Sequence, residues 1–515
     1  MENIQIEESL QKNLLKIFEE VDGPTLSERI NEAFEPLVDF MEKIFFWDPV
    51  AALGFKIEAD VPFIVLWVVL AGIFFTLWMK FINIRAFRHS LDLVRGKYNK
   101  PGERGEVSHF QALATALSAT VGLGNISGVA IAIVMGGPGA TFWMIIAGFF
   151  GMSLKFTECT LGVKYRRIGE NGIVSGGPMY YLVEGLKKKN LAGLGKVLAA
   201  LFALLIVASA MGGNMFQANQ AFAQFLVLVP SLQRNGAYFG IFLALLVGLV
   251  IIGGIKSIGR VTGRIVPFMA VLYLGTAMVI IIMNVGEIGN VFKLIVTSAF
   301  DAPAIKGGLV GVLITGFRRG AFSNEAGLGS SAIAHAPAKT EEPVNEGIVA
   351  LMEPFIDTII ICTMTSLVLI FTGFHQNPEG LEGTRLTSAA FGSVFPWFPY
   401  LLVGAILLFA YSTMISWSYY GVKGFDFLLG GITEKYPGKR ILATRIFTVL
   451  LLLCVIIGAS SSLSTVISFL DMVMITLAIP NVIGLVILGP EVRRDLKDYM
   501  KRLKAGEIPE NPRSK

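Results

Sequence analysis

The sequence is short of charge. Only 16% of its 515 residues are Asp, Glu, Lys or Arg, whereas 54% are hydrophobic and the mean hydropathy is +0.65. A soluble chain carries about 25% charged residues, so this composition excludes a soluble multidomain enzyme. Disorder is excluded as well, because a chain with 38 Phe and so few charges collapses in water. The remaining class is an integral membrane protein.

Cysteine and familiar local motifs are also scarce. The three cysteines, Cys159, Cys362 and Cys454, are scattered in apolar stretches and give neither a disulfide framework nor a metal-ligand spacing. No Walker lysine loop is present, which argues against transport driven by ATP. We expect no secretory signal peptide, because the N-terminal segment is acidic and amphipathic and the first apolar run is long enough to span a membrane.

Long apolar runs are abundant, and they predict membrane-spanning helices. Val61 to Met79 runs without a charge, which is longer than the short alternating segments of a transmembrane barrel. Lipid requires each span to satisfy its own backbone polar groups, which a helix does. Eleven windows are predicted: 61–84, 108–135, 138–163, 195–225, 238–256, 264–285, 308–335, 345–374, 398–423, 442–460 and 463–489.

The basic residues between these windows predict the orientation. Alternate connections, with the C-terminal tail, hold thirty Lys and Arg, whereas the opposite side holds nine. Because cytoplasmic loops keep the excess, we expect a plasma (inner) membrane protein with its tail inside and its N-terminus outside. Residues 1–60 carry fourteen acidic and five basic residues, and we expect an extracytoplasmic amphipathic cap there. The net charge of +5 therefore does not indicate nucleic acid.

The second window is interrupted by small and polar residues. Glycine lowers helical preference and frees backbone groups that must find other partners. Such residues often serve only the close packing of neighbouring helices, and this one cluster does not decide between the two interpretations. The interrupting residues are Gly122, Gly124, Asn125, Ser127 and Gly128.

The seventh window carries charge at membrane depth. Arg318, Arg319 and Glu325 lie in an apolar stretch with Asn324 and several glycines. Such charges are costly unless they face protein or water, and broken backbone is tolerated only where it lines a cavity or is buried in protein. A structural ion pair would explain the charges but not the glycines.

The two interrupted windows are five apart, which predicts an inverted repeat. Corresponding broken helices in two halves indicate a secondary transporter with its binding site between the breaks. The predicted divisions are an extension (1–60), a peripheral helix (61–84), two five-helix repeats (108–285 and 308–489) and a basic tail (490–515).

Several blocks resemble the alanine or glycine:cation symporter family, also called the sodium:alanine symporter family. The blocks, in the family's order, are TALSATVGLGNISGVA, GGPGATFWM, SGGPMYYL, GGIKSIGRVTG, GFRRGAFSNEAGLGSSAIAHA and YSTMISWSYYG. The resemblance implies an all-α membrane protein of the leucine-transporter type and sodium-driven uptake of a small neutral amino acid, alanine or glycine. It implies no enzymatic activity, no organic cofactor and no obligate protein partner.

The resemblance also implies roles for particular residues. The implied substrate site comprises Gly122, Leu123, Gly124, Asn125, Gly128, Asn214, Gln217, Phe322, Ser323 and Trp417. The implied sodium ligands are Ala119, Gly122, Ser412 and Thr413, with Asn125, Asp357 and Thr358 as further candidates. The gating candidates are Arg318, Arg319, Glu325 and Glu353, the two arginines being possible partners of Glu353 and Asp357. Many members have Thr where this chain has Leu123, and its N-terminal extension is longer than usual.

Three alternatives stay open at this point. The Ser412 and Thr413 hydroxyls could bond back to their own helix instead of holding an ion. Proton coupling through Glu158, Glu325 or His335 could replace sodium, although a Lys155–Glu158 pair three residues apart is more simply structural. An intramembrane hydrolase could use Ser330 or Ser331 with His335, but one helix would then carry both groups, and such a pair is weak evidence.

Overall fold

The structure is a computed structural model that describes residues 43, 46–54, 61–100, 102–169, 172–233, 235–300, 308–376, 380–381, 383–430, 437–461 and 463–511. The first half contains α3 (Pro49–Ala52), α4 (Phe63–Trp78), α5 (Ile82–Arg85), α6 (Phe87–Val94), α7 (His109–Thr120), η1 (Leu123–Asn125), α8 (Ser127–Gly136), α9 (Gly139–Lys164), α10 (Pro178–Lys188), α11 (Ala192–Leu228), η2 (Pro230–Leu232), α12 (Gly236–Ile251), α13 (Gly254–Met283), η3 (Val285–Glu287) and α14 (Ile288–Phe300). The second half contains α15 (Gly308–Asn324), α16 (Ser330–His335), α17 (Pro343–Ala350), α18 (Met352–Pro354), η4 (Phe355–Cys362), α19 (Thr363–Phe371), η5 (Phe374–Gln376), α20 (Thr384–Val394), α21 (Phe398–Leu428), α23 (Pro437–Ser460), α24 (Leu463–Thr476) and α25 (Ala478–Lys504). The strands β1 (Arg167–Ile168) and β2 (Val174–Ser175) form a short antiparallel hairpin.

The helical membrane architecture is confirmed. Among the described residues, seven helices are long and apolar enough to cross a membrane, or eight if the bent pair of α7 and α8 counts as one span. Every predicted window overlaps helix, but α4 and α12 have only 16 residues each. The total of eleven spans stays a prediction.

The first predicted interruption is confirmed. Helix α7 begins with a capping box in which the Ser108 hydroxyl accepts from the Gln111 amide and the Gln111 side chain accepts from the Ser108 amide. The helix ends at Thr120, and the chain passes through the single turn η1 before α8 begins at Ser127. The two helical parts meet at an angle of 56°.

The second interruption is also confirmed. Helix α15 ends at Asn324, and α16 begins at Ser330. Between them the backbone enters the left-handed region at Glu325, Gly327 and Gly329, with φ values of 55°, 85° and 82°. A side chain such as that of Glu325 seldom adopts this conformation, so surrounding contacts must hold it.

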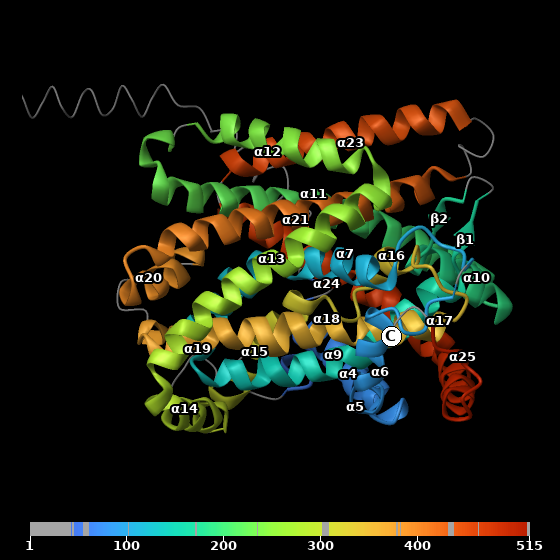
Figure 1. The fold of residues 1–515 in the computed structure, drawn as a ribbon, viewed down its shortest axis with the longest axis horizontal. Helices are drawn as coiled ribbons and strands as arrows, with labels where there is room; N and C mark the ends of the chain where they lie inside the picture. The colour runs from blue at the N-terminus through green and yellow to red at the C-terminus, as the bar shows by residue number, and fades with distance from the viewer. Residues whose placement is uncertain are drawn as a thin grey trace, which may run out of the picture.

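The helices form two packed groups (Figure 1). Helix α9 packs against α15, α16, α17 and α4, whereas α11 packs against α21 and α23. Helices α7 and α13 lie between the groups and both contact α21. The two breaks therefore lie in the interior of the molecule.

The predicted N-terminal extension is largely outside the described residues. Residues 1–42, which carry the amphipathic pattern, lie outside the described residues. Trp47 stacks on Phe63 at the start of α4, with ring centroids 6.0 Å apart. The role of this segment as a surface cap stays a prediction.

Candidate substrate and ion site

A buried hydrogen-bonded cluster joins the two breaks around Asp357. The Asn125 amide, beside the first break, donates to Asp357 Oδ1 at 2.6 Å and to the Ser323 hydroxyl at 3.1 Å. The Ser323 hydroxyl, from the last turn before the second break, donates to Asp357 Oδ2 at 2.7 Å. The Thr358 hydroxyl donates to the same oxygen at 2.8 Å. All four side chains are buried. We call these four residues the Asp357 cluster.

The helix that carries Asp357 is locally widened. Residues Phe355–Cys362 form a π-helical segment between α18 and α19. Such segments occur often at functional sites, because the wider turn directs side chains in a way that a regular helix does not. Here the wide turn directs both Asp357 and Thr358 toward the two breaks.

The Asp357 cluster has the chemistry of a hard-cation site. Buried carboxylates are normally paired with a cation or a metal. Within the described part of the chain, no Lys, Arg or His nitrogen forms an ion pair with Asp357. Carboxylate and hydroxyl oxygens, which Asp357, Ser323 and Thr358 supply, are ligand atoms that hard cations prefer, whereas Asn125 presents its NH2 group. Of the predicted ion candidates, Asn125, Asp357 and Thr358 are thus brought together.

A second polar region lies at Gly122. A Cβ atom at Gly122 would lie 2.8 Å from Thr413 Oγ1 and 3.3 Å from Gln217 Nε2, so only glycine fits between these side chains. The Thr413 hydroxyl crosses from α21 to donate to the Ser118 carbonyl of α7 at 2.8 Å. The Ser412 hydroxyl instead donates to the Phe409 carbonyl of its own helix at 3.1 Å. Of the predicted pair, only Thr413 has its hydroxyl directed at the first broken helix.

Polar atoms without partners surround this region. Asn214 donates to the Ser418 hydroxyl at 2.9 Å, which leaves its Oδ1 free. Gln217 Oε1 and the Ser127 hydroxyl are also buried without a hydrogen-bond partner among the described residues. Because buried polar groups are nearly always paired, these atoms identify a place where a polar ligand can bind.

A small pocket lies between the two broken helices. The space among its lining atoms is about 270 Å³, part of it open to solvent, and Phe322 contributes to its wall. Leu123 is buried but does not line it, and Trp417 packs over Gly213 of α11, 3.7 Å from where a Cβ atom would be. The lining residues are Gly124, Ser127, Gly128, Ile131, Phe216, Arg319, Phe322, Ile467, Leu470 and Asp471.

One side of this pocket is closed by an ion pair. Arg318 Nη2 lies 3.4 Å and Arg319 Nη1 lies 3.8 Å from Asp471 Oδ2. The expectation that these arginines pair with Glu353 or Asp357 is wrong, because α24 brings Asp471 to them instead. A single acidic residue in an apolar window was the available signal, and sequence reasoning missed it.

Glu353 belongs to a separate buried charge cluster. It lies 3.1 Å from Lys155 Nζ, which is closer than Glu158 at 3.8 Å, so the isolated Lys155–Glu158 pair is only part of the arrangement. Glu325 accepts a hydrogen bond from Ser330 at 2.5 Å. Neither Glu325 nor Glu353 contacts the arginines at the pocket, so their gating role stays a prediction with no contact to support it.

The hydrolase alternative is wrong. The Ser331 hydroxyl donates to Glu353 Oε2 at 2.7 Å, and Ser330 donates to Glu325. Both ring nitrogens of His335 are bonded to carboxylates, those of Glu346 and Glu353. His335 therefore has no free nitrogen with which to take a proton from a serine.

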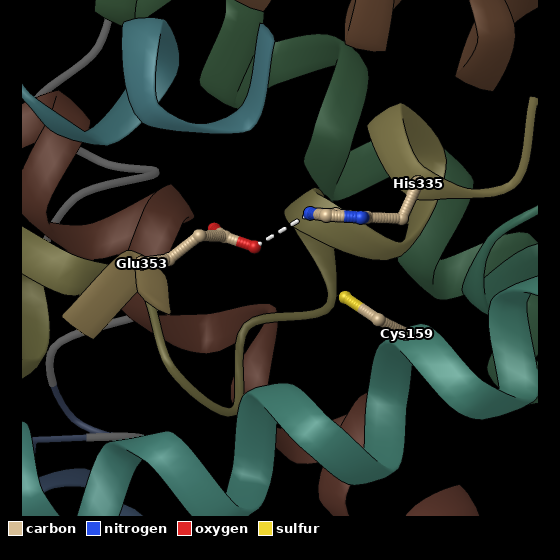
Figure 2. Close-up of side chains that lie close together, drawn as sticks. All are labelled: Cys159, His335 and Glu353. Carbon is tan, nitrogen blue, oxygen red and sulfur yellow. Dashed lines mark hydrogen bonds and ion pairs between the residues drawn. The ribbon is translucent and has the colours of Figure 1, made fainter. Parts of the chain in front are cut away.

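Cys159, His335 and Glu353 bring three metal-binding side chains together (Figure 2). Their donor atoms lie within 4.8 Å of one another. However, both nitrogens of the imidazole are occupied, and the Lys155 ammonium lies 3.1 Å from the carboxylate. These side chains do not fit a metal ion, because the Lys155 ammonium already pairs with the Glu353 carboxylate.

Most of the sequence matches the model of one protein family. The family model described as the sodium:alanine symporter family matches residues 53–513. The chain belongs to this family. It is 42% identical over 442 residues to the sodium/alanine symporter AgcS of Methanococcus maripaludis, covering 85% of this chain and 94% of AgcS. It is 36% identical over 441 residues to the probable sodium/glutamine symporter GlnT of Bacillus subtilis, covering 85% and 88%.

A solved structure supports the fold. The crystal structure of MhsT in complex with L-phenylalanine aligns with a TM-score of 0.53 at 16% identity, covering 75% of this chain and 89% of that one. This confirms the leucine-transporter type of fold. Membership of a symporter family also confirms that the chain is a multi-pass membrane transporter and not an enzyme.

Proposed function

We propose that this member of the sodium:alanine symporter family takes up a small neutral amino acid together with sodium, at the pocket between its two broken helices. The observation that carries the proposal is the Asp357 cluster, in which a buried carboxylate contacts residues beside both breaks and has no cationic partner in the described part of the chain. A sodium ion at these oxygens would neutralise the carboxylate and fix the breaks relative to each other.

The substrate is assigned to the first break. Freed amides and the positive end of a half-helix attract a carboxylate, and the turn from Gly122 to Gly128 provides both. Asn214 Oδ1 and Gln217 Oε1, which have no partner among the described residues, are suited to accept hydrogen bonds from the zwitterion's ammonium group. A second sodium ion is assigned to Gly122, Thr413 and the Ala119 carbonyl. Ser412 is not included, because its hydroxyl bonds the Phe409 carbonyl of its own helix.

The pocket favours a small side chain. Phe322, Phe216, Ile131 and Leu470 give it bulky apolar walls beside the Gly124 to Gly128 turn. AgcS is named for alanine and GlnT for glutamine, so family membership alone does not select the substrate. The apolar lining favours alanine or glycine over glutamine.

Coupling follows from shared residues. Sodium at Asp357 orders Asn125, and Asn125 Oδ1 accepts from the Gly122 amide at 2.9 Å. The ion therefore organises the backbone that binds the substrate, and such coupling is typically worth about 1–3 kcal/mol. Rocking of the α9-containing group against the α11-containing group would then expose the pocket on alternate sides.

The membrane topology is part of the proposal. The excess of basic residues supports a plasma membrane location with the C-terminal tail inside and an N-terminus outside. The repeats are assigned to 108–285 and 308–489, after the peripheral α4. The Arg319–Asp471 side of the pocket would then face outward.

The test is uptake by purified protein in proteoliposomes. Alanine, glycine, glutamine and phenylalanine are compared under inward gradients of sodium, potassium or choline, with no pH gradient. Uptake of alanine or glycine that requires sodium supports the proposal. Equal uptake in all three salts, or uptake that follows a proton gradient alone, rejects it.

A further inference from the structure

A continuous chain of buried charged groups runs from the start of α7 to the second break. His109 Nδ1 contacts Glu346, whose other oxygen contacts His335 Nδ1. His335 Nε2 lies 2.8 Å from Glu353 Oε1, and Glu353 Oε2 lies 3.1 Å from Lys155 Nζ. Lys155 lies 3.8 Å from Glu158, which accepts from the Gly329 amide at 3.1 Å.

The centre of this chain needs an extra proton. An ionised carboxylate only accepts hydrogen bonds, so an imidazole between two carboxylates must donate from both nitrogens. His335 lies between Glu346 and Glu353 in this way, which makes it an imidazolium or requires one carboxylate to be protonated. Either way, one more proton is bound there than a neutral imidazole and two carboxylates would hold.

Charge balance leads to the same conclusion. The chain holds three carboxylates, one lysine and two imidazoles, all of them buried. With neutral imidazoles, two negative charges would remain uncompensated in an environment that strongly disfavours them. With both imidazoles protonated, the chain is neutral.

The bound protons join the two broken helices. Glu346 of α17 accepts from His109 on α7, the helix before the first break, and from His335 on α16, the helix after the second. His109 Nε2 is buried without a hydrogen-bond partner among the described residues. Through Glu346, the first broken helix is therefore joined to the second.

We propose that His109, Glu346, His335 and Glu353 form a proton-binding latch. With protons bound, it holds α7 and α16 together, and loss of a proton lets them separate. The other titratable groups that face the latch are Lys155, Glu158 and Cys159 of α9, Arg166, Tyr181 of α10, Glu325 and Tyr420 of α21. The transport readout below rests on the proposed function.

The first experiment measures the pH profile of sodium-driven alanine uptake in proteoliposomes. The parent rate should change at least about fivefold as the pH rises from about 6 to about 10, because carboxylates on both sides of His335 hold its extra proton above the ordinary histidine range. His109→Asn and His335→Gln retain one amide donor but cannot hold the extra proton, so their rates should change less than about twofold. His89→Gln is the matched control, because His89 bonds the Tyr499 hydroxyl outside the latch, and it should keep the parent profile.

A second measurement gives the direction of the effect. Cys159 is buried beside His335 and Glu353, whereas Cys454 is remote on α23. Labelling of Cys159 by a membrane-permeant maleimide, relative to Cys454, should rise with pH in the parent and be independent of pH in His335→Gln.

The proposal is overturned if folded His109→Asn and His335→Gln proteins keep the parent profile, or if His89→Gln flattens it equally. If His335→Gln fails to fold, His109→Asn carries the test. Uptake by the parent at one fixed pH, in sodium against choline, tests the proposed function separately.

Discussion

The two breaks look alike in sequence but differ in the polar side chains beside them. At the second break, side chains bind the exposed main chain: Asn481 donates to the Gly327 carbonyl at 2.7 Å, and Glu158 accepts from the Gly329 amide at 3.1 Å. At the first break, the Thr365 hydroxyl donates to the Asn125 carbonyl at 2.9 Å and the Thr387 hydroxyl to the Ile126 carbonyl at 3.4 Å, while the Gly122 amide bonds locally to Asn125 at 2.9 Å. Buried atoms of Gln217 and Asn214 nearby have no partner among the described residues.

This difference indicates a structural role for the second break and a ligand-binding role for the first. The second break is held by protein groups, so its geometry is fixed before any ligand binds. Beside the first break, the amide oxygens of Gln217 and Asn214 have no partner among the described residues, so a ligand can supply one. The two meet at the Asp357 cluster, where Ser323 and Asn125 share one carboxylate.

The largest effect is expected when the Asp357 charge, which contacts residues beside both breaks, is removed. Asp357→Asn should weaken sodium affinity on the order of 100-fold, because hydrogen bonds and contacts to a buried charge are the strongest of their kind. Sodium titration of alanine uptake measures the change. Asp92→Asn, on the exposed part of α6, is the control and should leave the titration unchanged. An unchanged titration for Asp357→Asn would remove this carboxylate from the ion site.

A test confined to the first break uses its tightest glycine. Gly122→Ala places a Cβ atom 2.8 Å from Thr413 Oγ1, whereas Gly124→Ala meets nothing closer than 3.9 Å. Overpacking costs about 1–3 kcal/mol, so we expect Gly122→Ala to raise KM for alanine about tenfold. Gly124→Ala should raise it less. Equal effects would mean that contact with Thr413 does not set the geometry.

The second break should respond in stability and not in sodium dependence. Asn481→Ala leaves the Gly327 carbonyl and Glu158 without this partner, which should cost about 1–3 kcal/mol of stability. Thermal unfolding in detergent measures the loss, and sodium titration of uptake should retain its midpoint. A large shift of that midpoint would contradict the purely structural role of the second break.

The smallest effect is expected at the ion pair that closes the pocket. Asp471→Asn removes the charged partner of Arg318 and Arg319. Asp471 is buried, but its contacts of 3.4 and 3.8 Å are long and the Arg318 side chain is 33% exposed, so the pair is worth about 1 kcal/mol. We therefore expect a change of less than about fivefold in KM for alanine. Asp495→Asn removes a pair with Lys164 remote from the pocket and should leave KM unchanged. An equal response of both variants would show that the pair at the pocket has no special role.

The sequence predicted what depends on local signals. Glycines and charges inside apolar windows identified both breaks, and Asn125, Ser323 and Asp357 were all candidates. Their convergence on one carboxylate depends on tertiary packing and on the widened turn at Phe355–Cys362, which no local pattern reveals.

Other features could not be predicted for the same reason. Asp471 is about 150 residues from its arginine partners, and several acidic residues were equally plausible. Whether Ser412 or Thr413 is directed at α7 depends on the rotation of α21. His109 and Glu346 were overlooked because each lies at the start of a helix, where a polar residue needs no special explanation.

The central claim is that sodium at the Asp357 cluster prepares the first break for an amino acid. Its most direct test is calorimetric titration of purified parent and Asp357→Asn protein with alanine, in sodium and in choline. The account predicts that the parent binds alanine in sodium and at least about tenfold more weakly in choline, and that Asp357→Asn loses this difference. Equal binding by the parent in both salts, or an unaltered sodium dependence in Asp357→Asn, would contradict it.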